Sequence, residues 1–420
     1  MTPSIGIDRA PPEGPALHLT PAAIPSTPTQ EHRMKRLTSA LLLAAATLAL
    51  PAFGQEIVIG NLADITGGTG DVGKPYAEGI KAYTDYINST GGINGKKIKL
   101  LQQDYAYKIP EALALYKKFK DQDKVVAIQG WGSGDTEALK EQVAKDQIPY
   151  FSASYSAHLT DPAKSPYNFF CAVDYSTGLR GCLKYIKDNW KESRKPKVAF
   201  IYPDNGYGKA PIPAGKAYAL ELGFEIVGEE NVDLKALEAT TQLLNLKKKA
   251  PDFAWVGGTK PSTAVILKDA KKLGLQTKFF GNIWSADEES PKMTAGAEEG
   301  YLFVVGAALY GEKGPGMDVI KKVSGGQLRV SSWIRGWVSM MVMCEVLKVA
   351  DRNKELNGPG IRKYAEQLNN FNTQGLTAPI TFSNSDHRPF TSVIIAAFQG
   401  GKMVRKGTID LPRRADWKGF

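Results

Sequence analysis

Strand-like apolar runs alternate with helix-like stretches along most of this chain. EIVIGNL at 56–62 and KIKLLQQ at 97–103 are short apolar runs typical of strands, and they enclose a stretch of helical periodicity. Such pairs form one series up to Cys171 and a second series after it. Because strand–helix–strand units build parallel sheets, the alternation predicts an α/β fold with two doubly wound parallel-sheet lobes.

Two of the predicted helices carry clear apolar faces. Between residues 74 and 92, Tyr76, Ile80, Tyr83 and Ile87 recur at helical spacing and should share one face. A longer helix is predicted at 330–350, and its apolar stripe indicates core packing rather than a cofactor site. The members of that stripe are Trp333, Trp337, Met340, Cys344 and Leu347.

The rest of the chain fits the same scheme. The second series predicts helices at 176–191, 208–222, 240–249 and 261–273. After the long helix the chain returns to strands at PITFS, SVIIAAF and KMV, with Gly400 and Gly401 forming a hairpin turn.

The N-terminal region predicts export. Residues 1–33 are rich in Pro, Thr and Ala and are expected to be an unstructured extension. Residues 34–54 have the basic start, short apolar run and small residues of a signal peptide, with cleavage near Gly54. The apolar run is shorter than the ~20 residues that span a bilayer. We therefore expect the mature protein in the periplasm.

Charge and cysteine content bear on the possible partners and on disulfide formation. The net charge is +10, yet the lysines are dispersed without a basic block interleaved with aromatics, so we expect no nucleic-acid partner. Cys171 and Cys182 could form a disulfide in an exported protein, or Cys182 could be buried on a helix. Cys344 is expected to be a core thiol.

A phosphate-binding loop is excluded by one residue. GGTGDVGK at 67–74 has the glycine and lysine spacing of such a loop. Pro75 stands where a serine or threonine must contact magnesium. We therefore do not expect an NTPase, and we expect no cofactor.

The stretch GWGSGDTEALK at 130–140 resembles the nucleophile turn of a serine hydrolase, because Ser133 lies between a strand and a helix. Trp131 and Asp135 stand where that motif needs glycines. The mature chain has only His158 and His387 to act as a base, too few also for a metal site. A secreted serine hydrolase therefore remains only a remote alternative.

Binding without chemistry explains the same stretch better. Ser133 and the amides of the glycine turn can hold a small anion such as a carboxylate. The helix that follows adds a favourable partial positive charge, and we expect Asp135 or Thr136 to cap it. The alternative is a tight turn whose glycines serve only the backbone.

These residues resemble the periplasmic substrate-binding proteins of branched-chain (hydrophobic) amino acid ABC importers, the Leu/Ile/Val-binding type. The resemblance covers 56–406, and the order of its motifs is more specific than any one of them. The motifs are IVIGNLADITGG, INSTGGINGKKIKLLQQD, IYPDNGYG, DFAWVGGT, GLQTKFFG and PITFSNSDHR.

The resemblance implies two α/β lobes that are joined by three crossovers and enclose the ligand. It places lobe 1 at 55–173 plus 307–378 and lobe 2 at 174–306 plus 379–406, with a C-terminal tail at 407–420. It also implies a monomer that delivers its ligand to an inner-membrane ABC permease. A sensory module of the same fold would carry a membrane helix and a signalling domain, which do not follow residue 406.

The resemblance implies which residues of this chain bind the ligand. Ser133 falls at the carboxylate-holding position, and Ala153 and Tyr155 fall in the loop that contacts the amino acid. Tyr207 and Thr259 fall at the contact positions of the second lobe. Trp131 and Trp284 are expected to shape the apolar end of the site.

The chain departs from the Leu/Ile/Val type at the amine end of the site. Tyr155 replaces a threonine, and Ile283 and Trp284 stand where those proteins place the glutamate that neutralises the ammonium. Asp287 could substitute only if its loop shifts. The expected ligand is therefore a hydrophobic amino acid or related small carboxylate, and the alternative is an aromatic or other organic acid that lacks an amino group.

Overall fold

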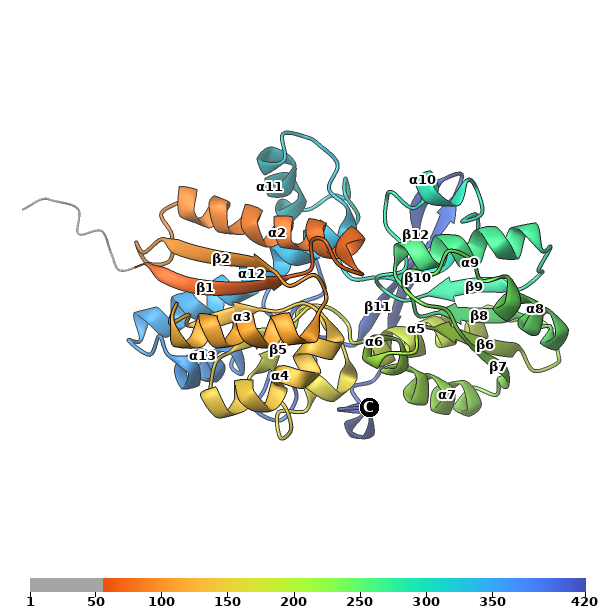
Figure 1. Ribbon diagram of the computed structural model, residues 1–420, viewed down its shortest axis with the longest axis horizontal. Coiled ribbons are helices and arrows are strands. Elements are labelled where there is room, and N and C mark those ends of the chain that lie inside the picture. The colour runs from red at the N-terminus through yellow and green to blue at the C-terminus, as the bar shows by residue number, and fades with distance from the viewer. Residues whose placement is uncertain (1–55) are drawn as a thin grey trace, which may run out of the picture. The chain divides into compact units, whose positions relative to one another are not determined.

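The computed structural model describes residues 56–420, so the predicted extension and signal peptide lie outside it. The first sheet has five parallel strands in the order β2-β1-β3-β4-β5 (Figure 1). Their bounds are β1 (Ile57–Ala63), β2 (Ile98–Asp104), β3 (Ala127–Gln129), β4 (Tyr150–Phe151) and β5 (Asn168–Phe169).

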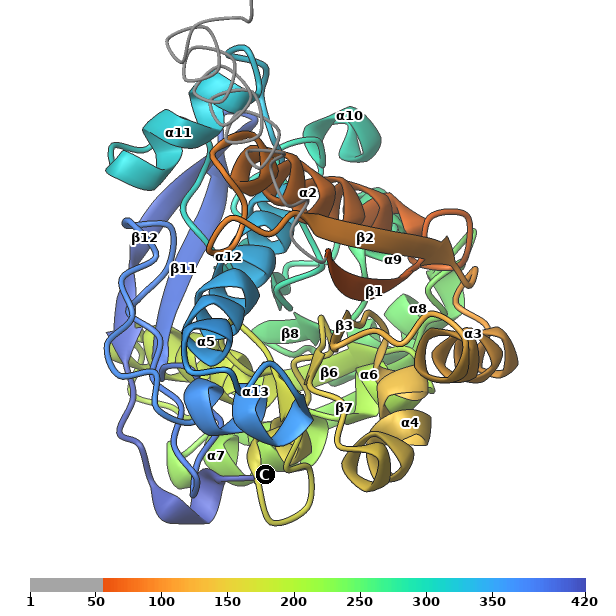
Figure 2. The ribbon, with the colours of Figure 1, turned by 90° about the vertical axis from the view of Figure 1, so that its left-hand side faces the viewer.

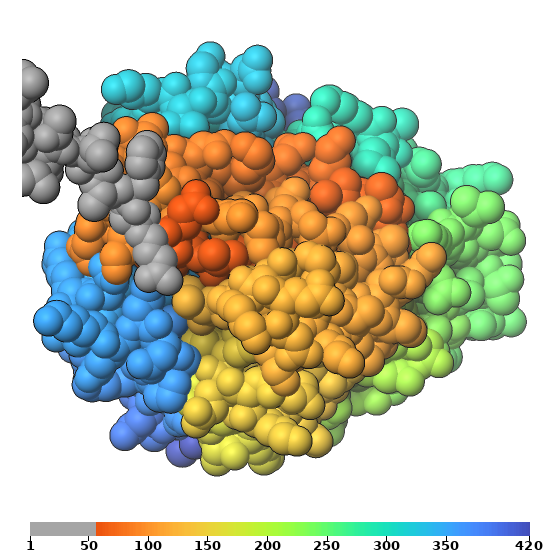
Figure 3. Space-filling model, turned by 60° about the vertical axis from the view of Figure 1, so that its left-hand side comes forward, coloured from red at the N-terminus to blue at the C-terminus, as the bar shows by residue number. Residues whose placement is uncertain are grey.

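Helices from two separate parts of the chain belong with this sheet, and together they form what we call the first lobe. Three come early, and three come after the second sheet has begun. They are α2 (Gly70–Ser89), α3 (Ile109–Asp121), α4 (Ser133–Asp146), α11 (Pro315–Val323), α12 (Ser331–Arg352) and α13 (Gly358–Ala365). Figure 3 shows α3 and α4, in orange to yellow, on one face of this lobe.

The second sheet has the order β12-β11-β10-β9-β8-β6-β7. Strands β6 to β10 pair in parallel, whereas β11 pairs antiparallel with both β10 and β12. The predicted parallel arrangement is therefore confirmed for β6 to β10, and the predicted hairpin of β11 and β12 adds an antiparallel edge. The bounds are β6 (Lys197–Tyr202), β7 (Glu225–Asn231), β8 (Phe253–Val256), β9 (Lys278–Gly281), β10 (Leu302–Val305), β11 (Ser392–Gln399) and β12 (Lys402–Asp410).

The helices of the second sheet complete what we call the second lobe. They are α5 (Tyr175–Asp188), α6 (Gly206–Lys209), α7 (Ile212–Glu221), α8 (Thr240–Lys249), α9 (Lys260–Lys272) and α10 (Pro291–Thr294).

Short 3-10 turns occur at η1 (Ala157–Thr160) and η2 (Ala415–Trp417). None of the helices within 56–420 is both long enough and apolar enough to cross a membrane.

Helices α2 and α12 cross in direct backbone contact beside β1 and β2 (Figure 2). A Cβ added to Gly79 would lie 2.0 Å from the carbonyl oxygen of Trp333, and one added to Gly336 would lie 2.0 Å from that of Tyr76. The predicted faces are confirmed, since Tyr76, Ile80 and Tyr83 are buried, Ile87 packs partly buried against the core, and the whole stripe of the long helix is buried. Glycine at the crossing lets both apolar faces reach the core.

Several predicted elements differ from the observed ones. The helix expected at 208–222 is divided, because Pro211 separates α6 from α7. PITFS forms only isolated bridges, from Ile380 to Phe371 and from Ser383 to Asp386, so the strand predicted there is wrong. The hairpin turn is confirmed, with φ of 56° at Gly400 and 70° at Gly401.

The structure places the three cysteines and the segment that leads into β11. Cys171, Cys182 and Cys344 are all free and buried, so the disulfide alternative is not formed. The backbone N–H of His387 donates to Thr160 at 2.9 Å, which ties this segment to the first lobe before the chain enters β11. The residue boundaries of the lobes stay a prediction.

Candidate functional site

A small cavity lies where the carboxyl ends of strands from both sheets meet. Its walls come from segments that follow β1 to β6, β8 and β9, which is the edge at which parallel α/β sheets bind ligands. The space left for the centre of a water molecule is about 20 Å³, enough for roughly one water. The lining residues are Thr69, Val72, Tyr107, Trp131, Gly132, Ser133, Ala153, Tyr175, Tyr207, Thr259 and Trp284.

Ser133 is the first residue of α4 and is only 6% exposed. Its Oγ accepts a hydrogen bond from Ser154 Oγ at 2.8 Å, so its own proton can be donated towards the cavity. The first N–H groups of a helix have no intrahelical acceptor, and they carry its partial positive charge. The start of α4 can therefore hold an anion.

The cap of α4 differs from the prediction. Gly132 is the N-cap residue, and no side chain caps the helix, so the expectation of Asp135 or Thr136 as the cap is wrong. Thr136 instead donates its hydroxyl back to the Gly132 carbonyl at 2.6 Å. Asp135 accepts from the Tyr105 hydroxyl at 2.7 Å. The N-terminal amides are thus left without a side-chain cap.

Trp131 lines the cavity, and a chain of hydrogen bonds fixes its side chain. Its Nε1 donates to Thr69 Oγ1 at 2.8 Å, and Thr69 in turn donates to Asp64 Oδ2 at 2.6 Å. Asp64 is fully buried and also accepts the backbone N–H of Thr69 at 2.7 Å. This chain of bonds fixes the indole in the first lobe.

The second lobe contributes two polar side chains. Tyr207, in α6, donates its hydroxyl to the Gly258 carbonyl at 2.9 Å, which fixes its ring. Thr259 is the N-cap of α9, but its hydroxyl makes no cap bond and, within 56–420, has no hydrogen-bond partner. An unpaired buried hydroxyl costs free energy, so a ligand that bonds to it would gain stability.

Aromatic rings from both lobes close the cavity. Trp284, from the second lobe, stacks on Tyr155 with centroids 5.4 Å apart and meets Trp131 edge-on at 4.9 Å. Its Nε1 donates to the Tyr175 hydroxyl at 3.0 Å. Tyr175 also meets Tyr207 edge-on at 5.4 Å. These rings fill the space that a ligand would need.

The structure brings the predicted residues to one place. Six of them line the cavity, and Tyr155 lies immediately outside it against Trp284. Their roles in binding stay predictions. Sequence reasoning missed Thr69, Tyr107 and Tyr175, and also the buried Arg335, which lies 3.7 Å above the Trp284 ring.

The carboxylate proposed to replace the missing glutamate already has a partner. Asp287 accepts a hydrogen bond from Lys260 Nζ at 2.8 Å, and the two side chains are only 2% and 6% exposed. Asp287 does not line the cavity. The charge of the Asp287 carboxylate is thus neutralised within the second lobe.

Asp135 gives the site a measurable pH dependence. Burial raises the pKa of Asp135 to about 7, although the Tyr105 hydroxyl lowers it, and one carboxyl oxygen has no partner within 56–420. Between pH 4 and pH 7 the unfolded chain releases this proton and the folded chain keeps it, so stability falls as pH rises.

We therefore expect wild-type protein to lose ~2 kcal/mol relative to Asp135→Asn between pH 4 and pH 7, since even ~1.5 pKa units correspond to that amount. Urea denaturation of both proteins across this range measures the difference. Equal pH profiles would show that Asp135 is ionised in the folded protein.

The arrangement lacks the partners of a hydrolytic serine. His158 pairs with Glu137, and His387 contacts the carbonyl of Asn168 and the carboxylate of Glu366. Neither histidine of residues 56–420 bonds to Ser133. The described residues also contain no cluster of His, Cys, Asp and Glu that could hold a metal ion.

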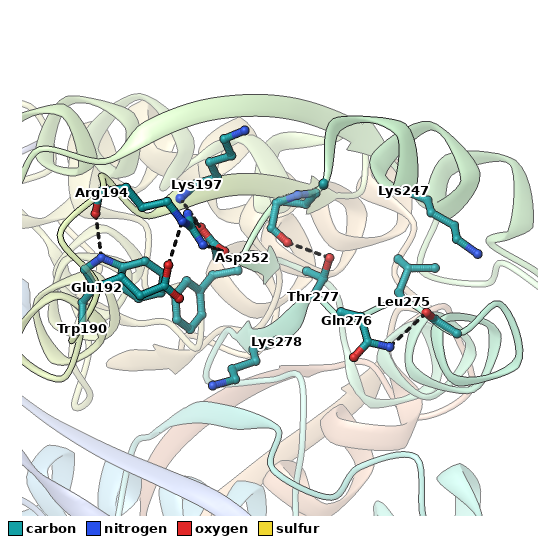
Figure 4. A pocket seen from close by; sticks show the side chains of 14 residues that line it. Trp190, Glu192, Arg194, Lys197, Lys247, Asp252, Leu275, Gln276, Thr277 and Lys278 are labelled. Atoms are coloured by element: carbon teal, nitrogen blue, oxygen red, sulfur yellow. Dashed lines mark hydrogen bonds and ion pairs between the residues drawn. The ribbon is translucent and has the colours of Figure 1, made fainter.

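Figure 4 shows a wider hollow of about 520 Å³ in the second lobe. It lies at the amino ends of strands such as β6 and β9, away from the edge where parallel sheets bind ligands. Arg194 pairs with both oxygens of Asp252 at 2.6 Å, and Trp190 Nε1 donates to the Arg194 carbonyl at 2.8 Å. Its central polar groups therefore satisfy one another.

Comparison with known proteins identifies the family. The match to the family described as "Periplasmic binding protein" spans residues 56–402. The chain belongs to the periplasmic binding protein family. This family consists of substrate-binding transport proteins, and its name implies a periplasmic location.

Curated relatives are distant but cover most of the fold. An "Amino acid binding protein" of Pseudomonas aeruginosa is 25% identical over 256 residues, which are 60% of this chain and 67% of that protein. A "Leu/Ile/Val-binding protein homolog 2" of Brucella abortus is 24% identical over 276 residues, which are 64% of this chain and 73% of that protein.

Solved structures of periplasmic binding proteins share the architecture. An ABC transporter substrate-binding protein of Aeropyrum pernix has a TM-score of 0.80 and 29% identity, covering 87% of this chain and 98% of that one. A branched-chain amino acid ABC transporter protein of Thermus thermophilus, crystallised with bound valine, also has a TM-score of 0.80 at 22% identity, covering 85% and 97%. The predicted fold and family are confirmed.

Proposed function

We propose that this protein is the periplasmic solute-binding component of an ABC importer. It binds a hydrophobic amino acid or a related small carboxylate between its lobes and delivers it to an inner-membrane permease. Export would depend on the predicted signal peptide at 34–54, and the protein would act as a monomer. The relatives described as amino-acid-binding and Leu/Ile/Val-binding support this class of ligand.

One observation carries the proposal: a single cavity is lined by the start of α4 from one lobe and by Tyr207 and Thr259 from the other. A carboxylate at Ser133 and the α4 amides would be contacted from the second lobe only when the lobes are together. Contacts of this kind favour the closed form and so drive hinge closure.

The cavity must enlarge before a ligand can enter. Its accessible space of about 20 Å³ is far smaller than an amino acid. Opening of the lobes would withdraw Tyr207 and Trp284 from the first lobe and let the ligand enter. When the lobes close again, the aromatic walls would surround its apolar group.

Substituting Ser133 by alanine is expected to weaken carboxylate binding ~10-fold to ~100-fold, because one hydrogen bond to a charged group is lost. Isothermal titration calorimetry with leucine, phenylalanine, benzoate and 4-hydroxybenzoate measures the effect. Ser152→Ala is a suitable control, since Ser152 Oγ bonds to the Ser154 carbonyl and does not line the cavity. Unchanged affinity in Ser133→Ala would contradict the proposed site, and hydrolysis of nitrophenyl esters that depends on Ser133 would revive the hydrolase alternative.

A further inference from the structure

Arg335 is a buried cation without a charged partner. It lies in α12 of the first lobe and is 3% exposed. Its Nε makes one long hydrogen bond of 3.4 Å to the Ser331 carbonyl, and its Nη1 has no partner among residues 56–420. A guanidinium stays protonated at neutral pH, so this is an unneutralised charge. Buried charges of this kind are costly and usually serve a function.

The guanidinium of Arg335 is covered by the second lobe. Its central carbon lies 3.7 Å above the ring of Trp284, which is itself a wall of the cavity. Burial lowers the pKa of Arg335, while the neighbouring Tyr155, Tyr76 and Tyr175 and the carboxyl of Glu288 raise it. Arg335 does not line the cavity, and withdrawal of Trp284 with the second lobe would expose it on the same lobe as Ser133.

No carboxylate near the cavity neutralises Arg335 within 4.0 Å in the described part of the chain. Asp287 pairs with Lys260 at 2.8 Å. Glu288 accepts the backbone N–H of Ser331 at 2.8 Å, and burial raises its pKa to about 7 although the charge of Arg335 lowers it. Among the described residues no acidic group near the cavity therefore forms an ion pair with Arg335, and burial raises the pKa of two unpaired carboxyls, Glu288 and Asp71, to about 7 and about 6.

The cavity wall itself contains no charged side chain. An ammonium group enclosed there would have no carboxylate in the cavity wall to pair with, and Arg335 would add a positive charge behind Trp284. With Trp284 displaced, an oxygen acceptor of the ligand would instead satisfy Nη1 of Arg335 and gain a charge-assisted hydrogen bond. The electrostatics of the closed site thus oppose an amine and favour an acceptor.

We infer that Arg335 is a specificity-determining residue that binds a second acceptor group of the ligand, and that the ligand is a small carboxylic acid without an ammonium group. The inference rests on the proposed function, because it concerns the same cavity. The ligand's first carboxylate lies at Ser133 and the α4 amides, and its oxo, hydroxyl or second carboxylate oxygen lies at Arg335. An arginine fork at that position distinguishes an oxygen acceptor from an amine.

Matched ligand pairs test this inference by calorimetry. Leucine is compared with 4-methyl-2-oxopentanoate, phenylalanine with phenylpyruvate, and glutamate with 2-oxoglutarate, so that within each pair an oxo group replaces the amine. In at least one pair the oxo acid should bind the wild-type protein ~30-fold or more tightly than the amino acid, because a buried charge without a partner is strongly unfavourable. Tighter binding of the amino acids would overturn the inference and leave the proposed function intact, whereas no binding of any amino acid or acid would contradict the proposed function itself.

Variants of the arginine complete the test. Arg335→Met should weaken binding of the preferred oxo acid ~10-fold or more and reduce the preference within its pair below ~3-fold. Arg352→Met, at the exposed far end of the same helix, is the matched control and should bind as the wild type does. Equal affinity of Arg335→Met and wild type would overturn the inference. If Arg335→Met does not fold, Arg335→Lys decides, because it keeps the charge and loses the fork: reduced oxo-acid affinity supports the inference and unchanged affinity overturns it.

Discussion

Replacing Gly79 by valine is expected to lower the free energy of unfolding by ~3 kcal/mol or more. Gly79 lies where α2 crosses α12, and any Cβ there would lie 2.0 Å from the Trp333 carbonyl oxygen and 2.9 Å from the Trp337 backbone nitrogen. These are backbone atoms, so no change of side-chain rotamer can relieve the clash. The helices would have to separate and expose the apolar faces that they bury against one another.

The crossing is reciprocal, which gives a second test of the same cause. A Cβ on Gly336 would lie 2.0 Å from the Tyr76 carbonyl oxygen, so Gly336→Val should be as damaging as Gly79→Val. The two substitutions together should cost less than the sum of both, because once the helices have separated the second side chain meets open space.

Urea denaturation of the four proteins measures these effects, with Gly407→Ala as the control. A Cβ on Gly407 meets no atom within 4 Å, so this variant should stay within ~0.5 kcal/mol of wild type. A loss below ~1 kcal/mol in Gly79→Val would show that the helices do not pack as closely as described.

The architecture could be predicted because it depends on short-range patterns. Alternation of apolar runs and helical periodicity located most strands of both sheets, although not the short β5, and the stripe of α12 was assigned correctly to the core. The failures have local causes. Proline at 211 divided a helix, and the apolar PITFS segment found no neighbouring strand.

The site was predicted in part because its residues follow strand ends in recognisable motifs. Ser133, Tyr207 and Thr259 each begin or precede a helix after a parallel strand, and the topology of the sheets then brings them together. Arg335 could not be found in this way. It lies within an apolar helical stripe, and only the three-dimensional structure places its guanidinium over a tryptophan that is 51 residues earlier in the sequence.

Removing one member of the Lys260–Asp287 pair is expected to lower the free energy of unfolding by ~3 kcal/mol. Lys260 is the first residue of α9, where the partial positive charge of the helix terminus disfavours a cation. Asp287 offsets this charge at 2.8 Å, and Glu289 lies farther away at 3.9 Å and is largely exposed. In Asp287→Asn the buried ammonium would keep its charge and lose its close partner.

A double-mutant cycle separates the pair from the packing around it. Asp287→Asn and Lys260→Met should each be destabilising, whereas the double variant should be more stable than either, because no buried charge is left unpaired. Lys292→Met is the matched control, since Lys292 pairs with Glu289 at 2.9 Å but is 76% exposed and should contribute at most ~1 kcal/mol. Strict additivity of the two single substitutions would contradict the pairing.

The same variant tests whether Asp287 has any role towards a ligand. Because its carboxylate is neutralised by Lys260, Asp287→Asn should change the affinities for an amino acid and for the matching oxo acid by the same factor, below ~3-fold. A selective loss of amino-acid binding would instead identify Asp287 as the partner of an ammonium group. That result would require Lys260 to release the carboxylate when the lobes close, and it would favour an amino acid over an amine-free acid as the ligand.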